Sequence, residues 1–205
     1  MKLTRMVVAA MVVAMVAQAG SRKPQANALV TVVTYSRASV PWAVRARAEQ
    51  VATAAFAAAG IEVRWVEGKR LGEPNAASGE MLTVVFDGPA PAQASRGAMA
   101  FTIVGGAADG DVHIFYNRVA RFAMFDGRVY MPELLGNVLA HELTHALEGA
   151  ARHSSEGLMK AVWSADDYAT MTRRRPLAFA AEDLELLRAR FQKETRPTLT
   201  IVGSR

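Results

Sequence analysis

The chain has 205 residues, of which 51% are hydrophobic and 21% charged, a balance typical of one globular domain. It contains no cysteine, which excludes disulfides, cysteine metal sites and a lipid-modified N-terminal cysteine. The formal net charge of +5 is a mild surplus without a basic stripe interleaved with aromatic residues, so no nucleic-acid partner is expected.

The N-terminus has the pattern of a secretory signal peptide. Lys2 and Arg5 precede an apolar run over residues 6–17, and Ala17 and Ala19 form a small-x-small cleavage signal. The apolar run is too short to hold the protein in a bilayer as a membrane anchor. Three segments are therefore predicted, a signal peptide, a linker and one exported domain, over residues 1–19, 20–28 and 29–205. The mature protein is expected to be secreted or periplasmic, without a stable membrane anchor; its oligomeric state stays open.

The mature sequence predicts strands and helices in an α/β (α+β) order. Apolar or alternating runs bounded by Gly, Pro or Asp are typical of strands, and they lie at residues 29–35, 61–65, 81–86, 98–104 and 112–116. Helices are expected at residues 41–60, 132–148 and 180–193. This order predicts a single domain in which helices pack against a sheet of mixed strand direction.

Three of the four histidines cluster in the helix predicted over residues 132–148 and just after it. The run His141-Glu-Leu-Thr-His145 places two imidazoles one turn apart on one face of that helix. Apolar residues share this face, so the histidines are expected to be buried. Glu142 lies one step round the helix and can reach a water on a metal without binding the metal itself. This pattern is typical of zinc peptidases, in which two histidines bind the metal and the glutamate is the general base.

His153 is the expected third protein ligand of the zinc ion. Catalytic zinc usually has three protein ligands and a water. If the helix continued past Gly149, His153 would lie about 12 Å beyond His145 along the axis. A left-handed cap at Gly149 instead reverses the chain and can bring His153 back to the metal. The alternative third ligand is an acid on the last helix, Glu182 or Glu185.

The same region resembles the metzincin zinc peptidases. Those enzymes have His-Glu-x-x-His-x-x-Gly-x-x-His, followed by a tight turn with a methionine beneath the metal. The run from His141 to Met159 is similar, with one additional residue before the glycine and one more before the third histidine. The resemblance implies a zincin-like domain in which His141, His145 and His153 bind Zn²⁺. It also implies that Glu142 is the catalytic acid/base and Met159 the Met-turn residue.

A closer likeness is to small, uncharacterised secreted bacterial proteins. They share His-Glu-Leu-x-His-x-Leu-x-Gly-x-x-x-His-Ser-x-x-Gly-Leu-Met, with a tryptophan soon after, here Trp163. This likeness runs from about Pro132 to Phe191. The earlier part of the chain is similar only in the order of its expected elements.

Other polar side chains near the motif are expected to be structural. His113 lies alone in a strand and is expected to be a structural or surface residue rather than a fourth ligand. Glu148 is expected to be a solvated residue at the helix end, with support of a metal ligand as the alternative. For Tyr168 we expect packing, with donation to a substrate, which some metzincins show, as the alternative.

Three functions compete. The first is an exported zinc metallopeptidase that hydrolyses a peptide or protein substrate with a zinc-activated water and Glu142 as general acid/base. The second is a zincin-like module that binds metal without hydrolysis and serves as a binding or envelope-structural module; the presence of Glu142 argues against it. The third is a metal-free domain with structural histidines. On family resemblance, the strand at residues 98–104 is expected to be the sheet edge that pairs with an extended peptide.

Overall fold

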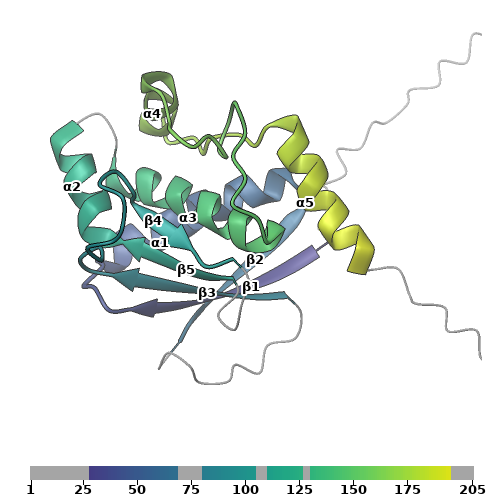
Figure 1. Cartoon of the computed structure of the whole chain (residues 1–205), viewed down its shortest axis with the longest axis horizontal. Helices are drawn as coiled ribbons and strands as arrows, with labels where there is room; N and C mark the ends of the chain where they lie inside the picture. The colour runs from purple at the N-terminus through teal and green to yellow at the C-terminus, as the bar shows by residue number, and fades with distance from the viewer. Residues whose placement is uncertain (1–27, 69–79, 105–109, 127–129, 195–205) are drawn as a thin grey trace, which may run out of the picture.

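A five-stranded sheet forms the base of the fold in the computed structural model, which describes residues 28–68, 80–104, 110–126 and 130–194 (Figure 1). The strands are β1 (Ala28–Ser36), β2 (Ile61–Glu67), β3 (Glu80–Asp87), β4 (Ala100–Thr102) and β5 (Asp111–Phe115). They lie in the order β2-β1-β3-β5-β4. All pairs are parallel except β4 with β5, so the predicted mixed sheet is confirmed. The predicted signal peptide lies outside the described residues.

The burial of each strand follows its apolar pattern. β1 pairs with β2 on one side and β3 on the other, and it is buried from Val30 to Thr34. A strand in the middle of a parallel sheet is covered on both faces, which explains its continuous run of β-branched valines and threonines. In β2, at the edge of the sheet, Ile61 and Val63 are buried and the residues after each are exposed, as their alternation predicts.

Two long helices, α1 (Trp42–Ala58) and α3 (Met131–Glu148), lie side by side on one face of the sheet (Figure 1). Gly136 of α3 makes their close approach possible. A Cβ at this position would lie 2.5 Å from Cβ of Val51 and 2.7 Å from the backbone oxygen of Ala48, both in α1. This contact sets the position of α3, which carries the histidine motif.

Two helices were not expected from the sequence. α2 (Tyr116–Asp126) follows β5 without a break, because no Gly or Pro separates the strand residues from the helix. α4 (Ala165–Thr172) begins at a capping box in which Ser164 and Asp167 each accept a hydrogen bond from the other's backbone. β4 is shorter than predicted, since a turn closed by the bond from Ala98 N to Ser95 O precedes it.

The last helix, α5 (Ala181–Glu194), agrees with the prediction. Two hydrogen bonds hold the chain between α3 and α5, one to α3 and one within that segment. The Asn137 side chain accepts a hydrogen bond from Leu177 N at 2.8 Å. Leu158 N donates to Ala178 O at 2.8 Å, and Leu158 itself is fully buried. Within the described residues, no helix combines the length and hydrophobicity that crossing a membrane requires.

Candidate metal centre

α3 presents His141 and His145 on the same face, one turn apart, with both rings largely enclosed. Each ring is oriented by a backbone carbonyl. Nδ1 of His141 donates to Leu158 O at 2.9 Å, and Nδ1 of His145 donates to Ala150 O at 3.0 Å. A carbonyl can only accept, so Nδ1 carries the proton in both rings and Nε2 is the free ligand atom.

The two free Nε2 atoms face each other at 3.1 Å. Two neutral imidazoles with protonated Nδ1 atoms cannot hydrogen-bond through Nε2, because neither nitrogen carries a hydrogen. Burial lowers the pKa of both His141 and His145. It therefore disfavours the charged imidazolium, which is the form that would carry a hydrogen on Nε2. Two nitrogens bound to tetrahedral zinc at ~2.0–2.1 Å lie about 3.3–3.4 Å apart. The pair therefore fits a metal ion better than it fits a hydrogen bond.

His153 completes a group of three imidazoles. α3 ends at Gly149, which has φ 61° and ψ 29°, the predicted left-handed cap. The reversal brings His153 back over the helix end, and its ring lies 5.4 Å from that of His141 and 5.0 Å from that of His145 between centroids. One ligand nitrogen from each of the three rings lies within 4.8 Å of the others. The structure thus brings together the three histidines that the sequence predicts as ligands.

Glu142 lies beside this group and contacts the sheet edge. Its Oε2 accepts a hydrogen bond from the Thr102 hydroxyl in β4 at 2.6 Å. Burial raises the pKa of the Glu142 carboxyl, while this hydrogen bond and the nearby histidines act in the opposite direction. Thr102 was not among the predicted site residues. It is 40 positions from Glu142, and no local pattern marks it.

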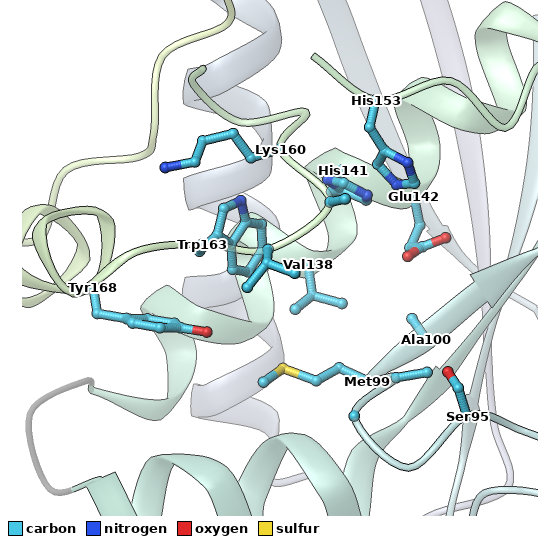
Figure 2. Close-up of a pocket in the computed structure, with 14 residues that line it drawn as sticks. Ser95, Met99, Ala100, Val138, His141, Glu142, His153, Lys160, Trp163 and Tyr168 are labelled. Carbon is cyan, nitrogen blue, oxygen red and sulfur yellow. The ribbon is translucent and has the colours of Figure 1, made fainter. Parts of the chain in front are cut away.

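A pocket of about 530 Å³ opens next to the histidines (Figure 2). His141, Glu142 and His153 lie at one end of it and Tyr168 at the other, with Trp163 between them, its ring centroid 5.8 Å from that of His141. The remaining lining comes mainly from small or apolar residues, namely Ser95, Gly97, Ala98, Met99, Ala100, Val138, Lys160, Ala161 and Val162. The site therefore combines a cluster of polar groups with an adjoining apolar cavity that can enclose a side chain.

The predicted Met-turn is a tight, buried turn behind the histidines. Gly157 has φ 71°, and a Cβ there would lie 2.5 Å from Ala178 O, so only glycine fits. Leu158 O accepts hydrogen bonds both from His141 and from the Trp163 indole, the latter at 3.0 Å. Met159 is fully buried, and its backbone oxygen accepts from Ser154 N at 2.9 Å. The turn thus fixes the ring of His141 through the backbone oxygen of Leu158.

The alternative third ligands lie elsewhere. Glu182 has a side chain that is 62% exposed and contacts Arg152, and Glu185 is exposed on α5; neither belongs to the histidine group. His113 is structural, as expected: its Nδ1 lies 2.7 Å from Asp87 Oδ2 and it stacks on Phe101.

Two further predictions have mixed outcomes. The expectation that Glu148 is solvated is wrong, because its side chain is only 7% exposed and is paired with Arg152 at 2.9 Å. Arg152, four positions further along, reaches back over the end of α3 and covers the Glu148 side chain. Tyr168 packs against Phe122 and Trp163, as expected, and it also lines the pocket, with its hydroxyl end pointing inward in Figure 2.

Known proteins resemble this chain in structure rather than in sequence. No protein-family model matches the sequence, and no curated protein is similar to it. Among solved structures, the chain is similar to the crystal structure of archaemetzincin from Methanopyrus kandleri. The identity is 14%, the TM-score is 0.49, and the match covers 83% of this chain and 98% of that chain. Function therefore has to follow from the side chains described above.

Proposed function

We propose that this protein is an exported zinc-dependent metallopeptidase. The observation that carries the proposal is the convergence of three imidazoles, from His141, His145 and His153, beside a carboxylate that is adjacent in sequence to the first of them. A purely structural zinc site is normally closed by four protein ligands, whereas a catalytic one has three and an open position. The described group has three histidines, and it opens to the pocket.

When bound, a zinc ion supplies Lewis acidity toward a carbonyl oxygen and toward water. Glu142 is the group in the chain suited to move the proton. Its carboxylate cannot easily bind the same ion as His141, because the two residues lie about 100° apart around the helix. Its raised pKa brings it closer to neutral pH, where a general acid/base works best. In this proposal Glu142 takes a proton from water and returns it to the leaving amine.

A peptide is the substrate that the surroundings favour. Met99 and Ile103 form backbone hydrogen bonds to β5, and these bonds alternate along an antiparallel strand. The backbone groups of Ala100 therefore face away from β5, at the edge of the sheet and on the pocket wall. An extended chain pairing with this edge would run past Glu142, and one of its side chains could enter the apolar cavity.

The test uses the exported protein purified without a histidine tag, with zinc content and cleavage of an unfolded-protein or peptide pool measured together. We expect about one zinc per chain and hydrolysis that chelation stops and zinc restores. Glu142→Gln is the matched control, because it keeps size and hydrogen bonding but removes the base. It should retain zinc and lose hydrolysis by about 10²–10⁴-fold.

Each other outcome points to a different function. A wild-type protein that binds zinc but cleaves no peptide in broad pools is a metal-binding module without catalysis. A protein that binds no zinc at all has structural histidines, and the proposal is then wrong. Export is checked separately by N-terminal sequencing, which should place the start of the exported chain near Gly20. An intact Met1 would contradict the signal peptide.

A further inference from the structure

His153 differs from the other two histidines in how it is held. His141 and His145 lie on a buried helix and each donates to a backbone carbonyl. His153 lies after the helix end, its side chain is exposed, and the described contacts of its ring are with the other two rings. A ligand on a connecting segment has to be ordered when the metal binds, unless other contacts have ordered it already.

The residues on either side of His153 are both tied to one atom. Arg152 Nη2 donates to Asp183 Oδ1 at 2.6 Å, and Ser154 Oγ donates to the same oxygen at 2.5 Å. Arg152 Nη1 also donates to Ser154 Oγ at 2.9 Å. Asp183 thus fixes the chain immediately before and immediately after the histidine, which leaves the backbone at His153 little freedom.

Asp183 is itself firmly placed. It is fully buried in the first turn of α5, and its Oδ2 accepts a hydrogen bond from Ala180 N at 3.1 Å. A helix N-terminus favours a negative charge. Arg152 also forms a two-pronged contact with Glu148 at the end of α3, at 2.9 and 3.2 Å. The network therefore connects the ends of two helices across the segment that carries His153.

A buried carboxylate is costly unless it is paired, and its removal strands a buried partner that has no other counter-ion. Without Asp183, Arg152 would still be paired with Glu148. The network therefore does more than neutralise Arg152, and its distinctive effect is on the path of the chain from Arg152 to Ser154.

We propose that Asp183 is a positioning residue for the third metal ligand, holding the segment from Arg152 to Ser154 so that His153 is in place before the metal binds. The inference rests on the proposed function, since it requires a metal at the three histidines. Asp183 is not one of the three grouped ligands, and the effect proposed for it is on the position of His153.

The test is a double-mutant cycle on metal affinity with the full chain. Zinc Kd is measured by competition with a chromophoric chelator for wild type, Asp183→Ala, His153→Ala and the double variant. Loss of a residue that orients a metal ligand typically weakens affinity by about 10–100-fold, and we expect this for Asp183→Ala. In the His153→Ala background the same change should have almost no effect, because the ligand through which it acts is gone.

Three measurements separate positioning from general stability. Glu182→Ala removes the neighbouring carboxylate on α5, which is exposed and lies 3.6 Å from Arg152. Because an exposed ion pair contributes little, the zinc Kd of this variant should stay within about twofold of the wild-type value. Asp183→Asn keeps the acceptor oxygen and should recover most of the affinity. With Co²⁺ as the probe, the visible spectrum of Asp183→Ala should resemble that of His153→Ala. If Asp183→Ala does not fold, Ser154→Ala, which removes one of the two ties, takes its place in the cycle.

The outcomes distinguish this inference from the proposed function. If wild type binds no zinc, both fail. If wild type binds zinc and Asp183→Ala binds it equally tightly, or weakens it by the same factor with and without His153, the positioning inference alone is wrong.

Discussion

The Thr102 hydroxyl donates a hydrogen bond to Glu142 Oε2 at 2.6 Å, joining the short edge strand β4 to the motif helix α3. The same hydroxyl is 3.1 Å from the Glu142 backbone oxygen. A residue of the sheet edge therefore fixes the orientation of the carboxylate that we propose as the acid/base. One side chain thus links the two elements and holds the Glu142 carboxylate in one direction.

Removal of that hydroxyl should slow hydrolysis while leaving the metal in place. Thr102→Val keeps the shape of the side chain but cannot donate. A hydrogen bond to a charged group contributes about 1.5–3 kcal/mol, so we expect kcat to fall by about tenfold or more, with zinc content unchanged. Thr102→Ser restores the donor and should recover most of the activity. Equal rates for Thr102→Val and wild type would show that the contact does not orient Glu142.

Substitution of the third ligand should distinguish His153 from the acids of α5. We expect His153→Ala to weaken zinc binding by at least about tenfold, because only two of the three protein ligands would remain. Glu182→Ala and Glu185→Ala should bind zinc like wild type, since both side chains are exposed away from the histidine group. The opposite pattern of affinities, measured by chelator competition, would place the third ligand on the last helix.

The burial of Glu142 should make the metal-free protein less stable at high pH than its Gln variant. The folded-state pKa of this carboxyl is raised above 4.5, so above that folded pKa the native state carries a buried charge at a cost. As pH falls toward 4.5, the native carboxyl takes up a proton before the unfolded one does, and the cost disappears. Glu142→Gln should therefore show a higher Tm than wild type at pH 8.

That difference in Tm should shrink as the pH is lowered toward 5. The measurement is thermal unfolding in the presence of a chelator, across a pH series. His141 and His145 titrate in both proteins, so they largely cancel from the comparison. A Tm difference that stays constant across the series would mean that the Glu142 carboxyl is not perturbed in the folded protein.

Gly136→Ala should destabilise the protein through the contact between α1 and α3. The new Cβ would meet Val51 and the backbone oxygen of Ala48, and backbone cannot move aside cheaply. Overpacking of this kind costs about 1–3 kcal/mol, which denaturant unfolding would detect. Gly97→Ala is the matched control, because no atom lies within 4 Å of a Cβ built there. Unchanged stability in Gly136→Ala would show that the two helices can separate without cost.

The sequence predicted those features that depend on neighbours along the chain. The strands followed from apolar runs, and the pairing of His141 with His145 followed from helix periodicity. The return of His153 was also predictable, because Gly149 directly after the helix indicated a left-handed cap. In each case one short stretch contains the whole pattern.

What could not be predicted depends on contacts between distant parts of the chain. Thr102 resembles any β-branched strand residue, and Asp183 resembles an ordinary acid in the first turn of a helix. Only the fold brings Thr102 to Glu142, and only the fold buries Asp183 against Arg152 and Ser154. α2 was missed for a different reason, since its first residue, Tyr116, continues the apolar run of β5 and no Gly or Pro separates the two elements.

The three histidines proposed as ligands and the glutamate proposed as acid/base depend on different stages of folding. All three histidines, and the carbonyls of Ala150 and Leu158 that orient two of them, lie between residues 141 and 158. Such a stretch closes only a short loop, which is entropically cheap and kinetically fast. The contact of Glu142 with Thr102 requires β4 to join the sheet first. Under the proposed function, the three histidines can therefore come together before Glu142 is oriented, and Asp183 holds His153 in place once α5 has packed.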